Sequence, residues 1–135
     1  MTLDRIKHIS AYGDMFPQEP ATEEQISSFE LKNKVKLPIK YRELLLFSDG
    51  GEWYRPSKIQ FYGVAHKPII DTTDDDKPNK DYIVIGRLTS GDPIVFKNGE
   101  ERVSIYNLEG GRIENDETYD DFYEFLDDMK GICGI

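Results

Sequence analysis

The sequence has little of the residue types on which metal proteins and cofactor enzymes depend. Its 135 residues include one cysteine, Cys133, and two histidines, His8 and His66. A single cysteine excludes an intramolecular disulfide, and no Cys/His spacing suited to zinc is present. A phosphate-binding glycine loop ending in Lys-Ser or Lys-Thr is also missing. We therefore expect no metal ion and no cofactor.

Catalytic motifs are equally scarce. A nucleophilic mechanism needs a nucleophile, a base and a group that orients the base, but the two histidines lie far apart in sequence and stand in no recognisable motif. His66 is interpreted as a loop or strand-end side chain. Cys133 is interpreted as a small tail side chain, because residues 131–135 contain no cation or histidine that would activate its thiol. A hydrolase built on scattered carboxylates ranks last, so we expect no catalytic residues and no enzyme.

Long apolar runs are absent. No stretch approaches the roughly 20 residues that cross a bilayer. The first nine residues mix charged and apolar side chains and do not form the apolar block of a signal peptide. Together with the single cysteine, this predicts a cytoplasmic location.

Positive charge is in the minority. The chain has 26 Asp and Glu residues against 17 Lys and Arg residues, which gives a formal net charge of −9. A negative field repels nucleic-acid phosphates and anionic membranes, and it attracts basic proteins. We expect a protein partner, with no direct binding to nucleic acid or to a membrane.

The composition supports one packed domain over residues 1–135. Hydrophobic residues make up 38% of the chain and aromatic residues 12%. A chain of this length buries roughly two-thirds of its extended surface, so it needs no disulfide or metal for stability. No internal repeat or linker divides it.

Residues 37–51 predict a helix with a defined start and end. Pro38 suits the first turn, where its missing N–H costs nothing, and the glycines of residues 49–51 end the helix. One face of this helix is expected to be buried: Leu37, Tyr41, Leu44, Leu45 and Ser48. An earlier helix is predicted after Thr22, which forms a capping box with Gln25.

The remaining chain predicts strands followed by a last helix. A short helix over residues 3–9 and a loop at 14–17 come first, and Ile26 and Phe29 of the second helix face inward. Apolar runs typical of strands follow at 59–62, 68–70, 82–85, 93–96, 102–106 and 112–113. Thr118 is expected to cap a final helix. Helices followed by strands predict an α+β fold with a mainly antiparallel sheet of about five or six strands.

Four segments stand in a recognisable order along the chain, at residues 21–26, 37–51, 85–96 and 118–126. In this order and spacing they resemble the SUKH superfamily, which includes fungal cell-wall assembly regulators and many bacterial immunity proteins. The resemblance covers residues 22–126 and implies a single SUKH-like domain with N-terminal helices, a central sheet and a C-terminal helix. It also implies a protein-binding role, as an immunity protein that neutralises a polymorphic toxin or, alternatively, as an intracellular regulator or scaffold.

Two acidic segments are candidates for the binding surface. Residues 114–128 contain eight carboxylates and no Lys or Arg, although an ordinary solvated helix face has the same composition. Residues 71–81 form a polar loop with three successive Asp residues. This loop lacks the glycine bend and the distal Glu of a calcium loop, so a solvated, mobile loop is expected.

Aromatic residues after the Gly-Gly corner are the third candidate. Trp53 and Tyr54 belong to the types enriched at binding hot spots, and core packing is the alternative. Many toxins neutralised by SUKH proteins are nucleases with basic clefts, and an acidic inhibitor can mimic phosphate there. We therefore expect a basic toxin domain as partner and a monomer or weak homodimer. The predicted contact residues are Trp53, Tyr54, Asp74, Asp75, Asp76, Glu114, Asp116, Glu117, Asp120 and Asp121.

Overall fold

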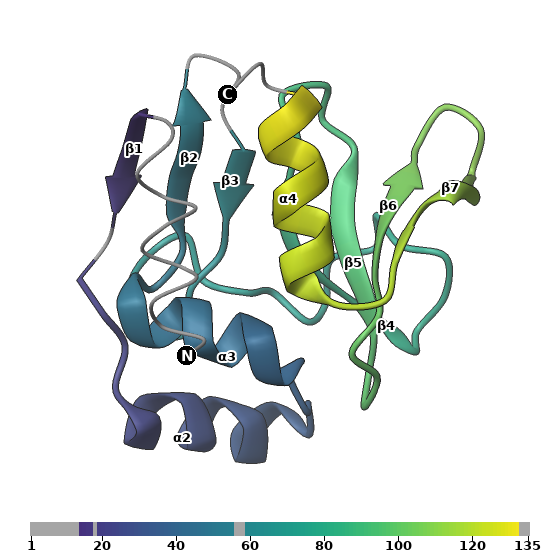
Figure 1. Ribbon diagram of the computed structural model, residues 1–135. Coiled ribbons are helices and arrows are strands. Elements are labelled where there is room, and N and C mark those ends of the chain that lie inside the picture. The colour runs from purple at the N-terminus through teal and green to yellow at the C-terminus, as the bar shows by residue number, and fades with distance from the viewer. Residues whose placement is uncertain (1–13, 18, 56–58, 133–135) are drawn as a thin grey trace.

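The computed structural model describes residues 14–17, 19–55 and 59–132 (Figure 1). The helix expected over residues 3–9, His8 and Cys133 lie outside the described residues. The described elements, in chain order, are β1 (Asp14–Pro17), α2 (Glu23–Asn33), α3 (Ile39–Phe47), β2 (Gly51–Arg55), β3 (Ile59–Phe61), β4 (Tyr82–Arg87), β5 (Pro93–Lys97), β6 (Val103–Asn107), β7 (Arg112–Tyr119) and α4 (Phe122–Ile132).

The described strands form one antiparallel sheet in which each strand pairs with the next in sequence, from β1 to β7. Helix α4 lies across this sheet, and α2 packs on the outer side of α3 (Figure 1). The expected α+β class, with N-terminal helices, an antiparallel sheet and a C-terminal helix, is confirmed. The sheet has seven described strands, more than the five or six expected, because residues 14–17 and 51–55 also pair.

Helix α3 has the predicted start, end and buried face. Pro38 precedes its first turn. The chain changes direction at Gly50, whose φ of 87° lies in the left-handed region that favours glycine. Leu37, Tyr41, Leu44, Leu45 and Ser48 are all buried. The capping box of α2 is also present, because Thr22 accepts from the Gln25 N–H and Gln25 accepts from the Thr22 N–H.

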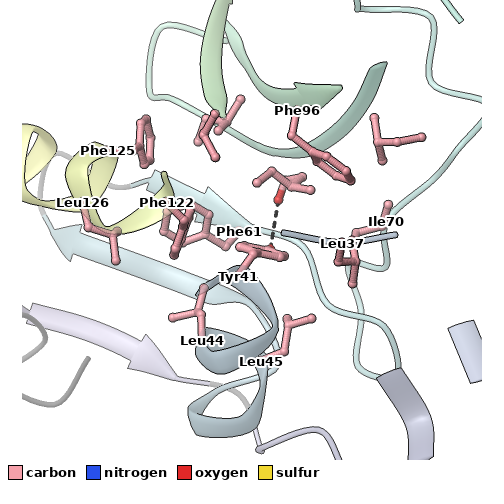
Figure 2. Packing of buried hydrophobic residues seen from close by; sticks show 14 of the residues in the cluster. Leu37, Tyr41, Leu44, Leu45, Phe61, Ile70, Phe96, Phe122, Phe125 and Leu126 are labelled. Carbon is pink, nitrogen blue, oxygen red and sulfur yellow. Dashed lines mark hydrogen bonds between the residues drawn. The ribbon is translucent and has the colours of Figure 1, made fainter. Parts of the chain in front are cut away.

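An aromatic cluster joins α3 and α4 to the sheet. The ring of Tyr41 meets that of Phe122 edge to face at 4.9 Å, and Phe61 on β3 lies 5.4 Å from Phe122 (Figure 2). The Tyr41 hydroxyl donates to the carbonyl oxygens of Tyr62 and Ile85, so it joins α3 to the end of β3 and to the middle of β4. Such edge-to-face contacts stabilise a core beyond the apolar area that they bury.

Three expectations about the elements are wrong. Residues 14–17 form strand β1 on the edge of the sheet, where a loop was expected. Proline cannot donate a backbone hydrogen bond, and Pro17 is tolerated because an edge strand pairs with a neighbour on one side only. Residues 68–70 contribute only one bridge, between Gly63 and Ile69, and form no strand. Thr118 lies on β7 opposite Ser104, so it does not begin the last helix.

Candidate partner-binding surface

Strand β7 carries three of the predicted acidic contact residues, Glu114, Asp116 and Glu117, and it leads directly into α4. Between the pairs Ser104–Thr118 and Tyr106–Ile113, β6 advances by two residues and β7 by five. The extra residues form a bulge at 114–117, at the last described strand of the sheet. The acidic segment is therefore strand and bulge up to residue 119, and only its later part belongs to a helix.

An open depression lies between this strand and α4. It has a volume of about 610 Å³. Its lining residues are Asp116, Thr118, Tyr119, Asp120, Glu124, Asp127 and Asp128. The lining holds five carboxylates and no Lys or Arg, so its potential is negative. We call this surface the acidic depression.

Like charges also crowd beside the acidic depression, at Glu117, which is not part of its lining. Partial burial, followed by the neighbouring charges of Asp116, Asp92 and Glu114, raises the pKa of Glu117 above its usual value. The Tyr119 hydroxyl donates to Asp128 at 2.6 Å, and burial together with this bond raises the pKa of Tyr119. A cation placed here would therefore gain attraction from several carboxylates at once.

Two neighbouring aspartates at this surface have different roles. Asp121 accepts from the Glu124 N–H at 2.9 Å and pairs with Lys40 at 2.8 Å, so it caps α4 and ties it to α3. Burial works to raise the pKa of Asp121, but the hydrogen bond and charge of Lys40 together with backbone N–H donors of α4 outweigh burial, so the pKa is lowered. The exposed Asp120 lines the acidic depression. Of the two, Asp120 is the better placed for a partner.

The second acidic segment is anchored by Arg87. This guanidinium pairs with Asp74 at 2.8 Å and with Asp76 at 3.0 Å, while Asp75 is exposed and lines a separate depression. None of Asp74, Asp75 and Asp76 lines the acidic depression. Two of the three aspartates in the loop have a positive partner within the chain.

Trp53 and Tyr54 lie on strand β2, which was not among the predicted strands, and Trp53 pairs with Ile59 of β3. The structure describes the backbone of these two residues. A contact of their side chains with a partner stays a prediction.

Sequence reasoning missed the most polar buried site, at Asp49. This fully buried carboxylate accepts from the backbone N–H groups of Val64, Ala65 and His66 at 2.8–2.9 Å, and from His66 Nδ1 at 2.8 Å. Gly63 precedes the three amides, and a Cβ there would lie 2.6 Å from Asp49 Cγ. The local sequence showed Asp49 only as the residue before two helix-ending glycines. We call this arrangement the Asp49 cradle.

The Asp49 cradle serves the fold. His66 Nε2 lies 3.4 Å from Glu19 Oε2, so each ring nitrogen faces a carboxylate of the chain itself. The hydrogen bond with Asp49 raises the pKa of His66 above its usual value although burial opposes this. Ser48 Oγ donates to the Gly50 carbonyl at 2.8 Å. The imidazole therefore helps to hold the 63–66 segment against Asp49.

The described part of the chain provides no cluster of three or more His, Cys, Asp or Glu side chains arranged to hold a metal ion. None of the described helices combines the length and the apolar character that crossing a membrane requires.

Comparison with known families finds a match over most of the chain. A family described as the SMI1 / KNR4 family (SUKH-1) matches residues 20–128, which include α2, α3, β2 to β7 and most of α4. A search of curated proteins finds no significant relative. Because the matched span covers most of the chain, the protein belongs to the SMI1 / KNR4 family (SUKH-1) and so to the SUKH superfamily.

Proposed function

We propose that this protein is a non-enzymatic protein-binding module, and that it acts in the cytoplasm as an immunity protein that neutralises a toxin domain. The observation that carries the proposal is the acidic depression, where five carboxylates line one open surface with no lysine or arginine among them. Membership of the SUKH superfamily is consistent with an immunity role or a regulatory role. The arrangement of charge favours a basic partner.

A basic cleft is the surface that fits best. Asp116 and Asp120 are exposed, and Asp127 and Asp128 follow on the outer side of α4. Carboxylates spaced along a strand edge and a helix can occupy positions that nucleic-acid phosphates take in a nuclease cleft. Long-range attraction then accelerates association, and close contacts set the lifetime of the complex.

A two-step experiment tests this function. The wild-type protein and an Asp116→Lys/Asp120→Lys variant are used as paired baits in the native cell, and proteins held only by the wild type are identified. Each captured protein is then expressed in a bacterial host with and without this protein. We expect one dominant partner that is toxic alone and harmless when the wild type is co-expressed.

The matched control is Asp75→Lys/Glu109→Lys, which changes two exposed acidic residues outside the lining of the acidic depression by the same total charge. It should capture the partner as the wild type does. A captured partner that is harmless alone would favour the regulatory alternative. Equal capture by the double variant and the wild type would contradict the proposed surface.

A further inference from the structure

The outer face of α2 carries a charged stripe centred on a small residue. Glu24, Ser28 and Lys32 are spaced by four residues, so they lie in one line along the helix. All three are exposed and all three line an open groove between α2 and the 63–70 segment. This groove has a volume of about 650 Å³.

Apolar surface flanks the stripe on both sides. Phe29 and Ile69 line the groove on one side, and Ile69 is 40% exposed. At 100° per residue, Leu31 falls on the opposite side of the stripe from Phe29. Leu31 is 83% exposed, which is more than any other large hydrophobic residue in the described ranges. Two exposed large apolar side chains, Leu31 and Ile69, therefore border the charged stripe, one on each side.

The stripe is complementary in charge to the same stripe of a second, antiparallel copy. Glu24 and Lys32 carry opposite charges and lie four residues before and after Ser28. A second α2, running antiparallel and related by a two-fold axis at Ser28, brings each Glu24 beside the Lys32 of the other copy. Within the chain, Arg42 pairs with Glu23 at 3.2 Å and with Glu30 at 3.8 Å, on the side of α2 that faces α3.

We propose that α2 is the isologous interface of a homodimer. Self-complementarity about a two-fold axis is what such an interface requires. The small Ser28 side chain lets the two helix axes approach, and Leu31 of each copy then packs over the Ser27 side of the other. One wall of the groove is held in place by the Asp49 cradle, so the surface is formed before the second copy arrives.

The dimer leaves the acidic depression free. Helix α2 packs on α3, whereas the acidic depression lies between β7 and α4 (Figure 1). A homodimer therefore displays two acidic depressions. This inference does not depend on what they bind, because the test below contains no partner.

Charge exchange along the stripe tests the proposal by sedimentation equilibrium at low salt. The wild type should show a reversible monomer–dimer equilibrium. In Glu24→Lys, a lysine at position 24 of each copy faces Lys32 of the other, so both contacts across the axis become repulsive. In Lys32→Glu, both contacts bring two glutamates together. Each variant should therefore weaken the dimer roughly tenfold. An equimolar mixture of the two variants should recover wild-type affinity as a heterodimer, since every pair across the axis is again of opposite charge.

Two further variants separate this interface from general charge effects. Glu109→Lys changes an exposed residue in the turn after β6 and should leave the dimer unchanged. Leu31→Gln removes apolar surface without altering charge and should weaken the dimer. A wild type that stays monomeric up to about millimolar concentration, or a variant mixture no stronger than either variant alone, would overturn the proposal.

Discussion

At the residue scale, the buried Asp49 carboxylate connects the end of α3 to a segment that follows β3. Its two oxygens accept three backbone N–H groups and one imidazole nitrogen. Burying a charge is unfavourable unless hydrogen bonds replace its water, and here four donors replace it. The side chain thus fixes a loop that has no strand or helix of its own.

Replacing Asp49 by alanine should reduce the free energy of unfolding by about 3 kcal/mol or more, because three amides and an imidazole lose their acceptor. Urea denaturation monitored by circular dichroism measures the change. Asp75→Ala, which removes an exposed aspartate, should change the free energy by less than about 0.5 kcal/mol. Equal stability of the two variants would show that the Asp49 cradle does not stabilise the fold.

His66 should make stability depend on pH. Its folded-state pKa is raised above the usual 6.5, chiefly by the hydrogen bond with Asp49. A raised pKa contributes stability that is complete below the unfolded pKa and is lost as pH rises through the folded pKa. The free energy of unfolding should therefore fall from about pH 6.5 upward in the wild type. In His66→Gln this part of the pH dependence should disappear, and identical pH profiles would refute the assignment.

The sequence could not reveal the Asp49 cradle. Asp49 and the amides that it binds are 15 to 17 residues apart, and two strands, β2 and β3, lie between them. Backbone amides have no signature in sequence, so only the fold shows that they converge. The one local signal was Gly63, since glycine can mark a close approach of another segment.

At the scale of elements, the start of α4 separates a structural aspartate from a surface aspartate. Asp121→Ala removes the cap of α4 and the pairing with Lys40, and it should cost about 1–2 kcal/mol of unfolding free energy. Asp120→Ala should cost less than about 0.5 kcal/mol, because its exposed carboxylate serves neither purpose. Thermal or urea unfolding of the two variants decides between them. A larger loss for Asp120→Ala would contradict the structure of this helix start.

Strands β3 and β4 approach closely at Gly86. A Cβ at this position would meet the Gln60 carbonyl oxygen at less than van der Waals distance. Gly86→Ala should therefore destabilise the protein by about 3 kcal/mol, as overpacking does elsewhere. Gly110→Ala is the control, since its Cβ would lie 3.7 Å from the nearest atom. A neutral Gly86→Ala, measured by urea unfolding, would show that the strands can separate at no cost.

Local signals predicted some elements and missed others. Pro38, the glycines after Asp49 and the capping box at Thr22 act within one turn of helix, so the sequence predicts α2 and α3 well. The start of α4 was wrong because Thr118 and Asp121 are both good caps, and pairing of Thr118 with Ser104 on β6 decides between them. Strand β1 was missed because its pairing with β2 joins segments more than thirty residues apart.

At the scale of the whole molecule, the net charge of −9 comes from acidic residues in different surroundings: some lie beside a cation of the chain and others do not. Arg87 neutralises much of the Asp74–Asp76 loop, whereas Asp116 and Asp120 line a depression with no cation. The sequence predicted two acidic segments but not which of their carboxylates remain available, because ion pairs such as those of Arg87 join residues that are distant in sequence. The contacts of Trp53 and Tyr54 with a partner remain a prediction.

The dependence of partner affinity on salt tests the central claim most directly. The measurement is the Kd of the wild type and of Asp116→Lys/Asp120→Lys for the captured partner, at about 0.05 M and about 0.5 M NaCl. If the acidic depression binds a basic face, wild-type affinity should fall by at least about tenfold with salt, and the double variant should bind weakly at both concentrations. Affinity that neither salt nor charge reversal changes would contradict the account.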